Sequence, residues 1–149
     1  MLLKSICTPE VACCGSQTTV LEAARLMRRR HTGDLVVVDG DEEGAAPLGV
    51  ITDRDIVVEV LGQGLDPATT TVGSIMRTPV VIANEGEEAA QALERMRQHG
   101  VRRIPVVGDR GKLVGVVTVD DLLRCLAAYA GSLADVVARE QTREQRNRR

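Results

Sequence analysis

Apolar and polar positions alternate along the chain in the same order twice. Continuous apolar runs at 35–38 and 104–107 end at the turn residues Asp39 and Gly108, which is typical of buried strands. Polar turns follow, and the stretches 47–52 and 112–118 predict a further strand in each half. Ala/Leu/Met-rich helical patterns precede the two runs, with Leu21, Ala23, Ala24 and Met27 on one face of the first helix.

Each half also contains a short β-prone segment at its start and a helical segment at its end, so the order is strand–helix–strand–strand–helix. The halves share Ser-Ile, Thr-Pro and a Gly-x-x-Thr-x-x-Asp element, "GVITDRD" at 49–55 and "GVVTVDD" at 115–121. A repeat of about 60 residues without large aromatic residues buries too little surface to be stable alone. We therefore expect an α/β fold in which two pseudo-symmetric β-α-β-β-α repeats pack sheet to sheet into one module.

The expected boundaries follow from the repeat and from a Gly/Pro/Thr-rich connector between its copies. They are a first repeat at 1–63, a linker at 64–72, a second repeat at 73–130, and a C-terminal helix with a polar, partly disordered tail at 131–149. The tail begins with Leu133, Val136 and Val137, which predict a short helix docked on the module or on a dimer mate. An Arg-rich hook for nucleic acid is the less favoured alternative for this tail.

The amino-acid composition disfavours several classes of function. Aromatic residues make up 1% of the chain, with Tyr129 as the one example, and the formal net charge is −2. Stacking platforms and a basic surface for nucleic acid are therefore not expected. No stretch has the length and apolarity of a membrane span, so we expect a cytoplasmic protein. The four cysteines show no metal-ligand or disulfide spacing and are expected to be reduced, packed thiols.

The ordered, repeated set of motifs resembles the tandem cystathionine-β-synthase-type (CBS) domain pair, or Bateman module, from about Lys4 to Tyr129. The resemblance rests on the Thr-Pro openings, the "VRRIPVV" strand and the "GVITDRD" and "GVVTVDD" elements, and "TDRDIV" with "GLDP" is similar to stand-alone bacterial members. It implies a regulatory module that senses AMP, ATP or S-adenosylmethionine in the cleft between the repeats. It also implies a homodimer, an adenosyl ligand rather than a catalytic cofactor, and control of a regulated protein.

The Thr-x-x-Asp pairs have two interpretations, and the sequence leaves both open. Thr52 with Asp55 and Thr118 with Asp121 match a capping box at a helix start. The same aspartates could accept hydrogen bonds from ribose hydroxyls, while the threonine and the helix N–H groups meet a phosphate. A glycine precedes each pair and permits close backbone approach.

Motif and resemblance together nominate ligand-binding residues from both repeats. They are Thr8, Pro9, Val11, Gly49, Thr52, Arg54, Asp55, Thr78, Val80, Arg102, Arg103, Ile104, Pro105, Gly115, Thr118 and Asp121. For Thr8 and Thr78 a plain strand start shaped by proline is an equal alternative. No catalytic or metal-ligating residue is nominated.

The two sites are expected to differ. The first element has Arg54 where the second has Asp120, and the first strand run has Val36 where the second has Pro105. A phosphate at the second element would face two carboxylates unless Arg102 and Arg103 supply positive charge.

Catalysis is not expected, because the chain has no glycine-rich dinucleotide loop, Walker loop, HExxH or recognisable nucleophile motif. Two alternatives to a nucleotide sensor are kept. One is a dimerisation or interaction protein without a nucleotide, and the other is a thiol-based redox sensor that uses Cys13 and Cys14.

Overall fold

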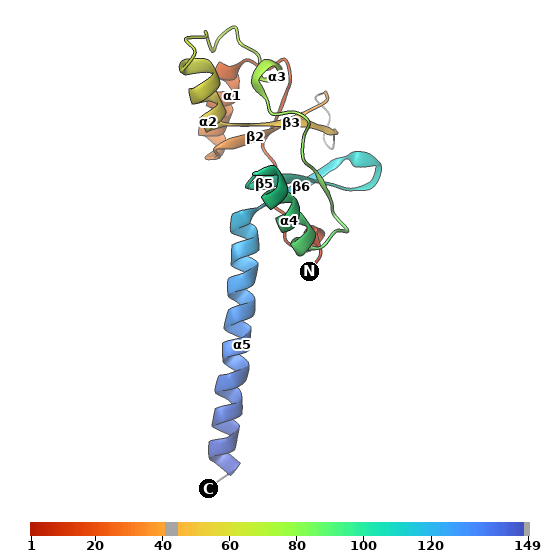
Figure 1. Ribbon diagram of the computed structural model, residues 1–149, viewed down its shortest axis with the longest axis vertical. Helices are drawn as coiled ribbons and strands as arrows, with labels where there is room; N and C mark the ends of the chain where they lie inside the picture. Colours follow the sequence, from red (N-terminus) through yellow and green to blue (C-terminus); the bar gives the residue numbers. More distant parts are fainter. Residues whose placement is uncertain (41–44, 148–149) are drawn as a thin grey trace.

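The computed structural model describes residues 1–40 and 45–147, which form two stacked units and a long projecting helix (Figure 1). The first unit contains β1 (Cys13–Gly15), α1 (Val20–Arg30), β2 (Asp34–Val38), β3 (Pro47–Thr52), α2 (Asp53–Asp55) and the π-helical η2 (Ile56–Leu61). The second contains β4 (Ala83–Asn84), α4 (Ala89–His99), β5 (Arg103–Val107), η3 (Asp109–Gly111), β6 (Leu113–Thr118) and α5 (Val119–Asn147). Two short helices, η1 (Leu3–Ser5) and α3 (Val72–Ile75), precede the first strand of each repeat. The predicted α/β class is confirmed.

The two sheets have the same topology. Their orders are β1-β2-β3 and β4-β5-β6, with the first pair parallel and the second antiparallel in each sheet. Asp34 begins β2 opposite Thr52, and Arg103 begins β5 opposite Thr118. Asp34 and Arg103 are therefore equivalent positions of the two units.

The central strand of the first sheet, β2, contributes to two cores, because successive side chains of a strand point to opposite faces. Leu35 and Val37 of β2 pack in the core of the first unit with α1. Val36 and Val38 instead join Val116 of β6 in a third cluster between the sheets. This inter-sheet cluster joins the two units into one module.

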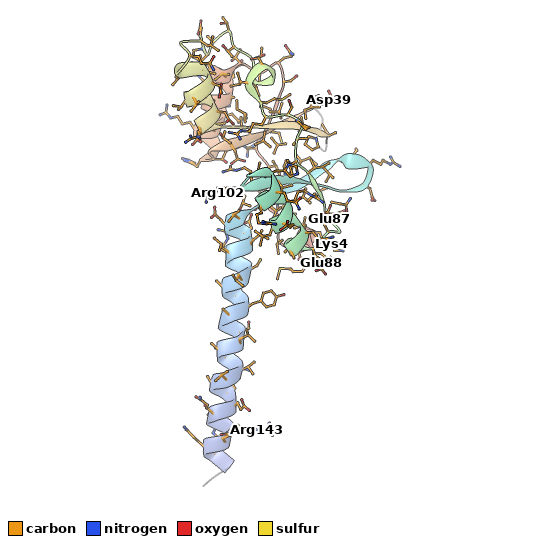
Figure 2. All side chains as sticks on the ribbon, viewed as in Figure 1. Lys4, Asp39, Glu87, Glu88, Arg102 and Arg143 are labelled. Atoms are coloured by element: carbon orange, nitrogen blue, oxygen red, sulfur yellow. The ribbon has the colours of Figure 1, made fainter. Side chains whose placement is uncertain are left out.

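The first segment of each repeat packs in the unit of the other repeat. Leu3 of η1 is fully buried in the second unit, and its N–H donates to the carbonyl of Glu87 at 2.9 Å. Figure 2 shows Lys4 beside Glu87 and Glu88, at the start of α4. Val72 of α3 is fully buried in the first unit, where its N–H donates to Thr18. The sequence analysis did not anticipate this exchange.

α5 is one continuous helix of 29 residues that projects away from both units (Figure 1). The prediction of a separate short helix after residue 130 is wrong, because the helix that begins at Val119 passes through Gly131 without interruption. Every residue from 126 to 146 is exposed. None of the described helices combines the length and apolarity that crossing a membrane requires. The polar stretch of the tail, expected to be partly disordered, is helical as far as Asn147, and residues 148–149 lie outside the described ranges.

Candidate ligand-binding site

A cleft of about 400 Å³ lies where the two units and their connector meet. Five of the nominated residues line it, namely Thr52, Arg54, Val80, Arg102 and Arg103. Sequence analysis missed the other lining residues, which are Val50, Asp53, Arg77, Pro79, Val81, Gly100 and Val101. The cleft therefore has an apolar part made of valines and proline and a charged part made mainly of arginines.

Four of the lining residues are arginines, and one, Asp53, is acidic. The side chains of Arg77 and Arg102 are 66% and 77% exposed, and each has a carboxylate partner outside the cleft, since Arg77 pairs with Asp55 at 3.2 Å and Arg102 with Asp120 at 3.9 Å. Asp53 accepts a hydrogen bond from the backbone N–H of Arg54 at 2.7 Å. The excess of arginine suits a phosphate or another oxyanion, which guanidinium binds through paired hydrogen bonds.

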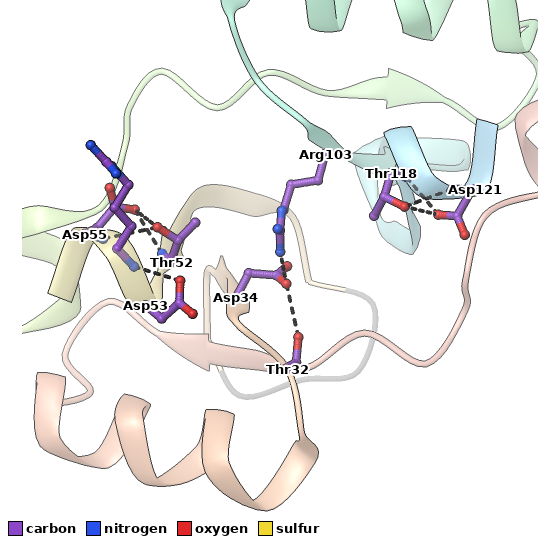
Figure 3. Close-up of polar contacts among 9 residues, drawn as sticks. Thr32, Asp34, Thr52, Asp53, Asp55, Arg103, Thr118 and Asp121 are labelled. Carbon is purple, nitrogen blue, oxygen red and sulfur yellow. Dashed lines mark hydrogen bonds and ion pairs between the residues drawn. The ribbon is translucent and has the colours of Figure 1, made fainter. Parts of the chain in front are cut away.

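Arg103 has a carboxylate partner in the other unit. It forms an ion pair with Asp34, and the hydroxyl of Thr32 donates to the same carboxylate at 3.0 Å (Figure 3). Burial lowers the pKa of Arg103, while the nearby charge of Asp120 acts in the opposite direction. Because Arg103 is engaged in this way, it stabilises the unit interface at the edge of the cleft.

Thr52 and Asp55 form a complete capping box at the start of α2. The Asp55 N–H donates to the Thr52 hydroxyl oxygen at 3.2 Å, and the Thr52 N–H donates to Asp55 Oδ2 at 2.9 Å. Arg77 Nε donates to the other carboxylate oxygen, Oδ1, also at 3.2 Å. Asp55 is 4% exposed and lies outside the 400 Å³ cleft, in a neighbouring hollow with Arg77 and Thr78. Both of its oxygens are therefore occupied by the protein itself.

Thr118 and Asp121 form the same network at the start of α5 (Figure 3). Here the second oxygen of Asp121 accepts from Arg124 Nη2 at 2.6 Å, within the same helix. Burial acts to raise the pKa of Asp121, but hydrogen bonds from Thr118 and Arg124 outweigh it and lower the pKa below its ordinary value. The capping interpretation thus has full geometric support in both repeats, and a ribose role for either aspartate stays a prediction.

The two Thr-Pro pairs do not occupy equivalent positions in the two units, because the second pair lies one residue further along the chain. Thr8 forms a β-bridge with Val116, whereas the equivalent bridge to Val50 is made by Arg77 rather than Thr78. Matching the two Thr-Pro pairs in the sequence therefore concealed Arg77. Alignment on the preceding Ser-Ile pairs places Arg77 opposite Thr8.

The motif glycines accommodate the exchanged segments. A Cβ atom on Gly49 would lie 3.0 Å from the carbonyl oxygen of Arg77, and one on Gly115 would lie 3.0 Å from that of Thr8. The backbone that closely approaches these two glycines is that of the exchanged segments of the same chain. A ligand is not required to explain them.

The remaining nominated residues do not converge on the 400 Å³ cleft. Ile104 and Pro105 are buried, and Ile104 belongs to the second unit's core, so these side chains are not available to a ligand there. Val11 packs against the inter-sheet cluster, and Pro9 is exposed.

The adjacent thiols of Cys13 and Cys14 are poorly suited to redox chemistry. Burial raises the pKa of the Cys14 thiol to about 11, and burial also raises the pKa of Cys13. The thiolate is the reactive form of cysteine, so these shifts disfavour oxidation at neutral pH. The geometry gives the redox alternative no support.

Two units of the same topology, packed around an interface with a charged cleft, define a tandem-repeat module. The CBS domain family model matches residues 3–62 and 72–128, and the chain belongs to this family. The resemblance to tandem CBS pairs is confirmed.

Relatives and solved structures agree with this assignment. Uncharacterized protein MK0525 of Methanopyrus kandleri is 39% identical over 82% of this chain, which spans 63% of that relative. The CBS domain pair of protein MJ0100, in complex with 5-methylthioadenosine and S-adenosyl-L-methionine, is 29% identical with a TM-score of 0.74, covering 87% of this chain and 98% of that one. PAE2072 from Pyrobaculum aerophilum, complexed with AMP, is 25% identical with a TM-score of 0.73, covering 82% and 90%.

Proposed function

We propose that the protein is a non-catalytic regulatory module that binds an adenosine-containing ligand in the 400 Å³ cleft between its two units. The observation that carries the proposal is the cleft itself, which combines a valine-lined part with four arginines. Its volume falls in the range of small-molecule sites. The two similar structures with adenosyl ligands support the class of ligand.

The charge of the cleft favours AMP or ATP over S-adenosylmethionine at this site. S-adenosylmethionine carries a positive sulfonium group, whereas the nucleotides carry phosphates that Arg54, Arg77 and Arg102 can pair with. The purine would lie against the apolar side chains of Val50, Val80 and Val101. A ribose role for Asp55 requires Arg77 to release Oδ1.

Calorimetry and thermal shift with AMP, ATP, adenosine and S-adenosylmethionine test this proposal. A ligand that binds only the folded state raises Tm, and the stabilisation grows with the logarithm of the ligand concentration relative to its Kd. Arg102→Ala is expected to lower the affinity for AMP and ATP by about tenfold, because one charge-assisted hydrogen bond is lost. The affinity for adenosine, which has no phosphate, should fall much less. Arg143→Ala, on the distal part of α5, is the matched control and should leave the affinities unchanged (Figure 2).

The absence of any Tm shift with all four ligands would contradict the proposal and favour the interaction protein without a nucleotide. Self-association as a homodimer, a regulated partner protein and a cytoplasmic location are further parts of the proposal. None of them depends on which adenosyl ligand is bound.

A further inference from the structure

Arg77 is the only described residue that lines both the 400 Å³ cleft and a neighbouring hollow of about 690 Å³. The cleft contains valines and three further arginines, whereas the hollow contains the carboxylates of Asp55 and Glu59. The Arg77 side chain therefore lies between the proposed nucleotide site and a buried carboxylate.

The Arg77 guanidinium contacts Asp55 through two nitrogen atoms. Nε and Nη2 each lie 3.2 Å from Oδ1 of Asp55. The side chain of Arg77 is 66% exposed and that of Asp55 is 6% exposed. Because an ion pair with a solvated cation is weak, the guanidinium is the partner that can leave, while the carboxylate stays in place.

The two oxygens of the Asp55 carboxylate have different partners. Oδ2 accepts hydrogen bonds from the N–H and the hydroxyl of Thr52, at 2.9 and 2.8 Å (Figure 3). Among the described residues, Arg77 is the only hydrogen-bond donor to Oδ1. A buried carboxylate oxygen is costly to leave without a donor. Oδ1 therefore needs a replacement donor whenever Arg77 moves into the cleft.

A nucleotide carries both groups that this exchange needs. Its phosphate can pair with the guanidinium through charge-assisted hydrogen bonds. Its ribose hydroxyls can then donate to Oδ1 of Asp55 in place of Arg77. Adenosine offers the hydroxyls alone, so it must displace Arg77 from Asp55 without giving the guanidinium a new anionic partner. Arg77 thus disfavours ligands that have a ribose and no phosphate.

In the described part of the chain, the second repeat has no equivalent of this arrangement. Thr8 occupies the position of Arg77, as the β-bridges show, and Asp121 is held by Arg124 of its own helix at 2.6 Å. Arg124 is not among the described residues that line the cleft. A phosphate in the cleft can therefore draw an arginine away from Asp55 but not from Asp121.

We infer that Arg77 determines the specificity of the cleft for phosphorylated ligands. In the free protein it covers Oδ1 of Asp55, and the phosphate of a bound nucleotide moves it from that oxygen into the cleft. The inference rests on the proposed function, because it concerns the same cleft. It adds the residue through which phosphate recognition and ribose recognition depend on each other.

Calorimetry with AMP, adenosine and 2′,3′-dideoxyadenosine tests the role of Arg77. The variant Arg77→Thr introduces the residue that the second repeat has at this position. It should lower the affinity for AMP about tenfold, because a charge-assisted pair is lost. It should raise the affinity for adenosine about threefold, the scale of a mostly exposed ion pair that no longer competes. Dideoxyadenosine lacks the two vicinal ribose hydroxyls and should not gain.

Arg124→Ala is the matched control, because it frees the equivalent oxygen of Asp121 outside the cleft. It should leave all three affinities unchanged. Arg77→Lys keeps the positive charge without the planar fork of the guanidinium, so its ratio of AMP to adenosine affinity should lie between those of the wild type and Arg77→Thr. This variant also tests the role if Arg77→Thr fails to fold, which thermal unfolding of the unliganded proteins reveals.

The outcomes separate the inference from the proposed function. If the wild type binds AMP but Arg77→Thr does not bind adenosine more tightly, or gains as much for dideoxyadenosine, the role of Arg77 is overturned and the proposed function stands. An equal gain for adenosine in Arg124→Ala likewise overturns the role of Arg77. A wild type that binds neither AMP nor adenosine overturns both.

Discussion

Asp34 of the first unit and Arg103 of the second unit make a direct side-chain contact between the units. They occupy equivalent positions at the start of β2 and β5, yet they carry opposite charges and form an ion pair (Figure 3). Their side chains are 18% and 32% exposed, so the pair is partly withdrawn from water. Removing one partner leaves the other charge incompletely solvated.

We therefore expect Asp34→Ala and Arg103→Ala each to lower the free energy of unfolding by about 2 kcal/mol, between the ranges for surface and buried pairs. The double variant should lose less than the sum of the single losses, because both substitutions remove one interaction. Urea unfolding measures all three. The exposed pair of Arg97 with Glu94 is the control, and Arg97→Ala should cost less than about 1 kcal/mol. Additive losses at Asp34 and Arg103 would show that the ion pair contributes nothing.

Asp121 links stability to pH. Its pKa is lowered in the folded chain, so the folded state favours the charged form. The contribution of the charged Asp121 carboxylate to the free energy of unfolding is complete above the unfolded-state pKa of about 3.9. It is lost as the pH falls through the lower folded-state pKa. Asp121→Asn should cost about 1 kcal/mol at pH 7, and the difference from the wild type should shrink progressively below pH 4. Unfolding curves at pH 7, 4 and 3 check this, and a constant difference would exclude the charge as its origin.

At the scale of elements, the exchange of the opening segments is the main feature of the fold. η1 and α3 are three and four residues long, yet each places a fully buried side chain in the core of the other repeat's unit. The segments that follow them then pass over Gly115 and Gly49. The glycine of each repeated motif thus makes room for backbone from the other half.

Leu3→Ala is expected to lower the free energy of unfolding by about 2–5 kcal/mol, because it leaves a cavity in the second unit's core. Leu2→Ala is the neighbouring control. Leu2 is 38% exposed, so its loss should be below about 1 kcal/mol. Urea unfolding measures both, and equal losses at the two positions would show that η1 is not part of the core.

At the scale of the whole molecule, the sequence predicted what local periodicity and motif determine. The valine-rich strands and the Thr-x-x-Asp helix starts were predictable, because each is encoded within a few residues. The burial of Leu3 was not, since η1 has no periodic pattern and the buried residues it joins, from Ala83 to Val117, are 80 to 114 positions further along the chain. A boundary was expected after residue 130, yet the backbone shows that α5 continues to Asn147.

The cleft could be predicted only in part for the same reason. Thr52, Asp53 and Arg54 belong to a recognisable motif, but Arg77 lines the cleft through the arrangement of segments that are distant in sequence. The role of Arg77 depends on a one-residue displacement between the repeats that only the β-bridges reveal.

The opposite charges at the equivalent positions 34 and 103 mean that one repeat cannot simply replace the other. Two first halves assembled in this geometry would oppose carboxylate to carboxylate, and two second halves would oppose guanidinium to guanidinium. Like charges at close range repel. The two repeats are therefore complementary rather than interchangeable at this position, and a chain that carried the same repeat twice would exchange this ion pair for a repulsion.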